Sequence, residues 1–136
     1  MILAIDTTHA IGSIALVEQG VVLKEITLDG GYVYSHLLFE AIAELGAAMD
    51  TIDGFAAACG PGTFTGVRIG LTAVKGLGEA MHKPAYGLSN LEALLTFAKT
   101  PHAIPFYDAR RGDVYARLED GSEVVMPLAQ VLQLAT

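Results

Sequence analysis

A loop rich in glycine and threonine carries the densest set of groups that could do chemistry. Residues 60–70 read Gly-Pro-Gly-Thr-Phe-Thr-Gly-Val-Arg-Ile-Gly, between a short apolar run and a helical pattern. Backbone N–H groups and the hydroxyls of Thr63 and Thr65, placed at the positive end of a helix, can bind phosphate. A Walker A loop needs a lysine directly after Gly66, where Val67 stands, so a P-loop NTPase is excluded.

A second polar cluster, Asp6-Thr7-Thr8, ends the first apolar run, where an actin-like nucleotidase places an acidic residue and hydroxyl groups beside phosphate and metal. The glycine usual in that loop is absent, and a turn capped by Asp6 is the alternative. For residues 60–66 the alternative is a tight turn, with Thr63 or Thr65 as helix cap. The candidate phosphate-binding residues are Asp6, Thr7, Thr8, Gly60, Gly62 and Thr63.

The remaining reactive side chains form no catalytic constellation. The four histidines are scattered, with no two at the i, i+4 spacing that aligns ligands on a helix, so no metal site is expected. Cys59 has no base beside it in sequence and is expected to be a small buried residue. No Ser, Thr or Cys lies in a recognised nucleophile motif. The sequence therefore favours a binding subunit with no catalytic residues and no cofactor.

Alternating strands and helices position these groups. Strand-like runs cover residues 2–5, 11–17, 21–28, 54–59, 85–88, 102–107 and 114–119. Helical patterns cover residues 35–49, 66–81, 89 or 90 to about 99, and a final stretch to 135. The short turns between the first three strands predict an antiparallel meander. The order βββαβα, followed by a second series, predicts an α/β layered fold.

The predicted helix at 66–81 is rich in small residues, although each glycine costs up to about 1 kcal/mol relative to alanine. Close approach of another backbone offsets this cost. That backbone belongs either to the sheet beneath, which the sequence slightly favours, or to a helix of another protein. With the apolar face of helix 35–49, this helix is the candidate interface. The candidate interface residues are Leu37, Leu38, Ala41, Ile42, Leu45, Gly66, Arg68, Ile69, Gly70 and Ala73.

The composition describes an acidic chain with enough apolar residues for a core. Its 136 residues are 52% hydrophobic and carry a net charge of −7. Because RNA affinity comes from clustered Lys and Arg, direct RNA binding is not expected. A single cysteine fits a reducing cytoplasm. Neither a signal peptide nor an apolar run of about 18 residues is present, so a cytoplasmic protein without a membrane span is expected.

The second half of the chain partly repeats the first. Ile2–Asp6, a turn, a strand and a glycine are mirrored by Ile104–Asp108, a turn, a strand and a glycine. This echo predicts two duplicated lobes, a complete one at 1–101 and an incomplete one at 102–136. Residues 108–113, Asp-Ala-Arg-Arg-Gly-Asp, form either a hairpin turn with solvated charges or an exposed contact surface for a partner.

Three motifs in this order resemble the bacterial TsaB family: residues 2–7, 60–70 and 108–115. The resemblance covers residues 1 to about 120 and implies a ribonuclease H-like, actin-type ATPase fold. It also implies a non-catalytic scaffold, related to the catalytic subunit TsaD, that has lost the nucleotide and metal site. With the ATPase TsaE, the complex would transfer a threonylcarbamoyl group to the adenosine beside the tRNA anticodon, without direct tRNA binding by this chain.

The resemblance further implies a partner surface made from helices 35–49 and 66–81, which binds TsaD or forms a homodimer. The small residues of the second helix would then allow close packing across subunits, and Gly70→Leu would abolish pairing. Two features depart from the family: the incomplete second lobe, and Val33-Tyr34-Ser35-His36, where the first helix usually opens with His, Ser or Thr, and an acidic residue. An actin-like ATPase and a glycoprotease-like metallopeptidase are the alternative functions.

Overall fold

The computed structural model describes residues 1–29 and 34–135, which form two compact units, Met1–Leu88 and Ser89–Thr136. We call them unit 1 and unit 2. The sequence predicted two duplicated lobes with a boundary between residues 101 and 102. That division into duplicated lobes stays a prediction. Val33, the first residue of the predicted helix-start motif, lies outside the described residues.

Unit 1 is built on a five-stranded sheet of order β3-β2-β1-β4-β5. The strands are β1 (Ile2–Asp6), β2 (Ile11–Glu18), β3 (Val21–Asp29), β4 (Gly54–Ala58) and β5 (Ala85–Leu88). The β1-β2 and β2-β3 pairs are antiparallel, whereas the β1-β4 and β4-β5 pairs are parallel. The meander and the α/β fold predicted from the sequence are confirmed.

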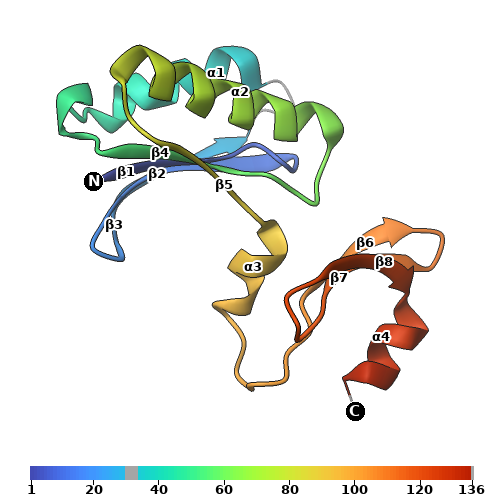
Figure 1. Ribbon diagram of the computed structural model, residues 1–136. Helices are drawn as coiled ribbons and strands as arrows, with labels where there is room; N and C mark the ends of the chain where they lie inside the picture. The colour runs from blue at the N-terminus through green and yellow to red at the C-terminus, as the bar shows by residue number, and fades with distance from the viewer. Residues whose placement is uncertain (30–33, 136) are drawn as a thin grey trace. The chain divides into compact units, whose positions relative to one another are not determined.

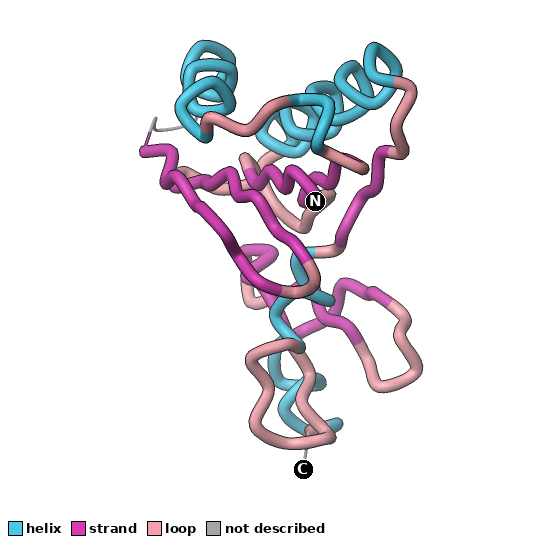
Figure 2. The backbone as a smooth tube through the Cα atoms, turned by 90° about the vertical axis from the view of Figure 1, so that its left-hand side faces the viewer, coloured by secondary structure: helices cyan, strands magenta, loops and turns pink. Residues whose placement is uncertain are grey.

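Two helices, α1 (Tyr34–Leu45) and α2 (Phe64–Met81), lie over one face of this sheet (Figures 1 and 2). The alternation of side chains along β1 turns Leu3 and Ile5 into the core, while Ile2, Ala4 and Asp6 stay half-buried. Leu3 and Phe55 are fully buried in one cluster with residues of both helices. Each such side chain contributes about 1.5–3 kcal/mol on burial, so the helix pair is held firmly on the sheet.

The first helix is shorter than predicted. It ends at Leu45, because Gly46 adopts φ 70°, which breaks the helical path. Met49, the predicted last residue, begins the 3-10 turn η1 (Met49–Thr51). The second helix begins two residues before the predicted start and ends at Met81 as predicted, with His82 left-handed at its C-cap.

Unit 2 has a three-stranded antiparallel sheet of order β6-β7-β8. Its elements are α3 (Asn90–Leu95), β6 (Phe106–Arg110), β7 (Asp113–Arg117), β8 (Glu123–Pro127) and α4 (Leu128–Leu134). A small core joins Val114 and Ala116 of β7 to Val131 of α4. Two predictions were wrong here: α3 ends before residue 99, and the strand expected at 102–107 begins at Phe106. The strand β8 was not predicted.

Candidate functional site

A groove between α1 and α2 is a candidate binding surface of unit 1. Its volume is about 520 Å³ and its walls are mostly apolar. This size and polarity match sites that receive apolar groups of a ligand or partner. The lining residues are Leu38 and Phe39 of α1, and Thr65, Arg68, Ile69, Thr72, Ala73, Gly76 and Leu77 of α2.

Phe39 and Arg68 line this groove, and the ring of Phe64 contacts Arg68 beside it. Phe39 is 58% exposed and Phe64, at the first turn of α2, is 76% exposed. The guanidinium carbon of Arg68 lies 5.0 Å from the centroid of the Phe64 ring, a cation–π contact. Exposed aromatic side chains beside arginine are typical of residues that dominate protein–protein binding. The groove is therefore suited to a protein partner.

The predicted interface residues lie partly along this groove and partly in the core, and Leu38 and Ala73 belong to both. Leu38, Arg68, Ile69 and Ala73 line the groove. Ala41 and Leu45 are buried inside unit 1, as are Gly66 and Gly70, whereas Leu37 and Ile42 are half-buried. The apolar stripe used for the prediction is mainly the face that packs on the sheet.

Two small residues of α2, Gly66 and Gly70, pack closely against Thr7, which directly follows β1. A Cβ on Gly66 would lie 2.0 Å from the carbonyl oxygen of Thr7, and one on Gly70 would lie 2.9 Å from the Thr7 hydroxyl. The internal explanation of the small residues is therefore the one that applies to Gly66 and Gly70, and packing across subunits is not needed for them. Gly70→Leu would disturb this packing whatever its effect on a partner.

The sequence missed the groove residues that lie off the core-facing stripe, notably Phe39 and Thr72. Phe64, the first residue of α2, stacks on Arg68 and was also absent from the predicted interface. A usable signal was present, because Phe39 and Phe64 are aromatic residues that the helical periodicity does not require for the core. Apolar rings outside the buried stripe indicate a contact surface more specifically than the stripe itself.

The two candidate phosphate loops pack directly on each other. The Thr63 N–H donates to the Thr8 carbonyl at 2.8 Å, and the Thr7 hydroxyl donates to the Gly66 carbonyl at 2.7 Å. A Cβ on Gly62 would lie 2.5 Å from the Cβ of Thr8. The two loops therefore lie in contact, which the sequence did not predict, and several of their polar groups bond to one another.

Within each loop, the structural alternative accounts for the polar residues. Asp6 Oδ1 accepts from the Thr8 N–H at 2.8 Å and from its hydroxyl at 2.6 Å, so Asp6 caps the turn. Thr63 is the N-cap of α2, and its hydroxyl accepts from the Gly66 N–H at 3.1 Å. Gly60 has φ 103°, a left-handed value that favours glycine. Thr7 and Thr8 are buried, at 1% and 0% exposure.

Other candidate groups are spread apart. Among residues 1–29 and 34–135, no group of three or more His, Cys, Asp or Glu side chains is placed to hold a metal ion. Cys59 is exposed, and the prediction that it is buried was wrong, because β4 ends one residue earlier. Within the same described ranges, no helix is both long and apolar enough to cross a membrane.

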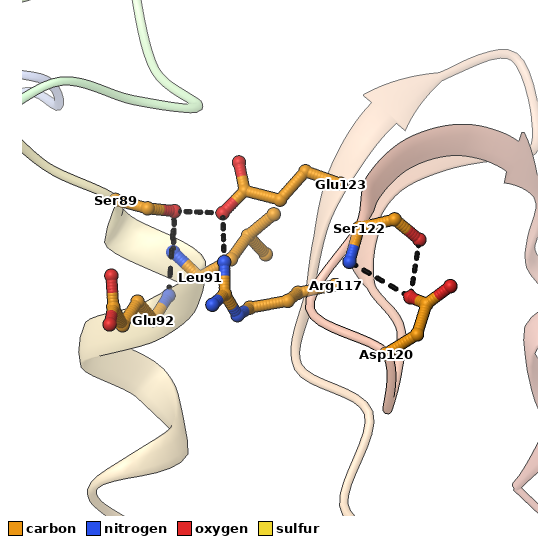
Figure 3. Close-up of polar contacts among 7 residues, drawn as sticks. All are labelled: Ser89, Leu91, Glu92, Arg117, Asp120, Ser122 and Glu123. Atoms are coloured by element: carbon orange, nitrogen blue, oxygen red, sulfur yellow. Dashed lines mark hydrogen bonds and ion pairs between the residues drawn. The ribbon is translucent and has the colours of Figure 1, made fainter.

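In unit 2, polar contacts join α3 to the β7–β8 hairpin (Figure 3). Glu123 Oε1 accepts from the Ser89 hydroxyl at 2.5 Å and pairs with Arg117 Nη1 at 3.2 Å. Ser89 also caps α3 by accepting from the Leu91 N–H. In the turn nearby, hydrogen bonds from the Ser122 hydroxyl and backbone N–H lower the pKa of Asp120 below its ordinary value of 3.8.

Comparisons with known proteins agree with this architecture. Residues 33–130 match the family described as TsaD: tRNA N6-adenosine threonylcarbamoyltransferase. The tRNA threonylcarbamoyladenosine biosynthesis protein TsaB of Bacillus subtilis is 34% identical over 123 residues, which cover 86% of this chain and 54% of that protein. An uncharacterized protein of Mycobacterium tuberculosis is 35% identical over 135 residues, which cover 93% of this chain and 63% of that protein.

A solved structure extends the match to the fold. YeaZ from Pseudomonas aeruginosa superposes with a TM-score of 0.72 at 29% identity, covering 93% of this chain and 66% of that chain. Fold and sequence together define a mixed α/β protein of the glycoprotease-like superfamily. The chain belongs to the TsaD family and, within it, to the TsaB/YeaZ proteins. It spans 54% of the Bacillus protein and 63% of the mycobacterial one.

Proposed function

We propose that this chain is a non-catalytic scaffold subunit in the threonylcarbamoyladenosine modification of tRNA. It binds a TsaD-type catalytic paralogue through the groove between α1 and α2, and it acts with a TsaE-type ATPase. The observation that carries the proposal is the groove, an apolar hollow of about 520 Å³ beside exposed Phe39 and Phe64. The TsaB relative of Bacillus subtilis is named for the biosynthesis of the same modified nucleoside.

The non-catalytic part of the proposal is supported by the two loops that were candidates for phosphate. The Thr7 hydroxyl and the backbone N–H groups of Thr63 and Gly66 bond inside the chain. A phosphate would have to compete with these contacts and displace closely packed backbone. The net charge of −7 supports a scaffold that leaves tRNA contact to its partner. A homodimer through the same groove is the competing assembly.

Mass measurement on a mixture tests the proposal. The chain, of 14.3 kDa, is mixed at micromolar concentration with the purified TsaD-type subunit of the same organism and separated by gel filtration with light scattering. A species with the summed mass of the two chains is expected, formed at the expense of any homodimer. Elution of both proteins at their separate masses would sink the proposal.

A further inference from the structure

The hairpin between β6 and β7 holds two arginines in a backbone conformation that arginine rarely adopts. Arg110 has φ 70°, Arg111 φ 57° and Gly112 φ 89°. The loop between the strands consists of Arg111 and Gly112, and type I′ hairpin turns of this length need positive φ at both positions and prefer Asn-Gly. Arginine therefore stands where asparagine would be more stable.

Arg110 adds a second unfavourable position. The β6–β7 register shifts between Asp108 and Arg110, so Arg110 follows a bulge and still has positive φ. Glycine is the residue that such positions favour. Two neighbouring residues thus reduce the stability of the hairpin, and strained positions of this kind cluster where a protein makes functional contacts.

The charges of both arginines are open to a ligand. Both residues are exposed, and the ion pairs found within residues 1–29 and 34–135 include neither of their guanidinium groups. Asp108 Oδ1 accepts from the Arg110 backbone N–H at 2.7 Å, so it supports the turn. By contrast, Arg68 stacks on Phe64 and Arg117 pairs with Glu123.

Behind this turn, Tyr107, Tyr115 and Val125 occupy paired positions across the three strands. Tyr115 is paired with Tyr107 on one side and Val125 on the other. Tyr115 is 41% exposed and Val125 is 58% exposed, whereas their neighbour Val114 is buried on the α4 side. Tyrosine beside arginine is the composition of binding hot spots between proteins.

We propose that the surface formed by Arg110, Arg111 and Tyr115 docks an acidic patch of a second protein. Two adjacent guanidinium groups can each bind a carboxylate through two parallel hydrogen bonds, and the tyrosine ring supplies apolar contact beside them. RNA fits less well. Two arginines between Asp108 and Asp113, on a chain of net charge −7, do not form a track of cations along a phosphate backbone.

Two substitutions separate the binding role of these residues from their role in the fold. Arg111→Asn and Arg110→Gly place preferred residues at the left-handed positions, so each is expected to raise the melting temperature by a few degrees. The same changes remove the charges. Lys99→Gln is the matched control, because Lys99 is another exposed cation of unit 2. It is expected to leave the melting temperature within about one degree.

The binding test rests on the proposed function for its probes: the TsaD-type and TsaE-type subunits of the same organism, alone and together, and an unmodified tRNA. The double variant, which carries both Arg110→Gly and Arg111→Asn, is expected to bind one of the two proteins at least tenfold more weakly than wild type, most clearly at low salt. Lys99→Gln should stay within twofold. Binding of both proteins within twofold by the double variant overturns the inference, as does an effect on tRNA alone.

The two proposals fail in different ways. If the wild-type chain forms no complex with the TsaD-type subunit, the scaffold function fails, while hairpin-dependent binding of the TsaE-type subunit still supports the docking surface. If the wild-type chain pairs with the TsaD-type subunit and the double variant binds every probe unchanged, only the hairpin inference fails. A wild-type chain that binds neither protein overturns both.

Discussion

The glycines of α2 have different surroundings, and their roles follow from those surroundings. Gly66 faces the backbone of Thr7, and Gly78 faces the carbonyl oxygen of Lys83, where a Cβ would lie at 2.8 Å. Gly76 has no atom within 4 Å of the position that a Cβ would take. The sequence shows three similar glycines, whereas the structure separates close backbone approach from an open groove wall.

This difference predicts opposite effects of the same substitution. Gly66→Ala should lower the free energy of unfolding by at least about 2 kcal/mol, because the new methyl group overlaps a backbone carbonyl that cannot move freely. Gly76→Ala should raise it by up to about 1 kcal/mol, because alanine is the better helix former. Urea denaturation of the two variants measures both changes. Equal midpoints would contradict the assigned surroundings.

At the residue scale, the sequence predicted which residues form the two polar loops but not what their polar groups bind. The spacing of Asp6, Thr7 and Thr8 and of the loop at 60–66 singled out two polar loops, and the structure shows that these loops lie in contact. The choice between phosphate cradle and turn cap depends on which atoms face each other. The spacing of residue types along the chain does not determine that, so both alternatives stayed open.

At the scale of elements, strong periodicity predicted most of unit 1. The strand at 85–88 and the end of α2 at Met81 agree with the structure, because a short β-rich run and a long helical pattern are clear signals. The end of α1 was wrong, because the apolar spacing continues past Gly46 while the backbone does not. β8 was missed, because its apolar run, Val124 to Met126, leads directly into α4.

The turn between β7 and β8 gives a prediction on pH at this scale. Since the folded pKa of Asp120 is lowered, its hydrogen bonds stabilise the turn above pH 3.8, and this contribution is lost as pH falls through the lower folded pKa. Ser122→Ala removes the largest cause, the hydroxyl hydrogen bond, so the pKa of Asp120 should rise towards 3.8. A carboxyl titration followed by NMR checks this. An unchanged pKa would show that the hydroxyl does not bond in solution.

At the scale of the whole molecule, the family, the acidic charge and the groove support one role. The chain belongs to the TsaB/YeaZ proteins, and its charge of −7 disfavours independent RNA binding. The apolar groove and its aromatic neighbours provide a surface that a protein partner can bury. The resemblance predicted the helix pair as a partner surface, and the proposed contact uses the groove between these two helices.

The affinity of the chain for the TsaD-type subunit, compared between two variants of α2, tests the scaffold role most directly. Thr72→Arg places a long cation in the groove beside Arg68, whereas Lys75→Gln changes an exposed residue outside the groove lining. By calorimetry, Thr72→Arg should bind at least about tenfold more weakly, a loss of about 1.4 kcal/mol or more, and Lys75→Gln should match wild type. A folded Thr72→Arg variant with wild-type affinity would contradict the proposed groove interface.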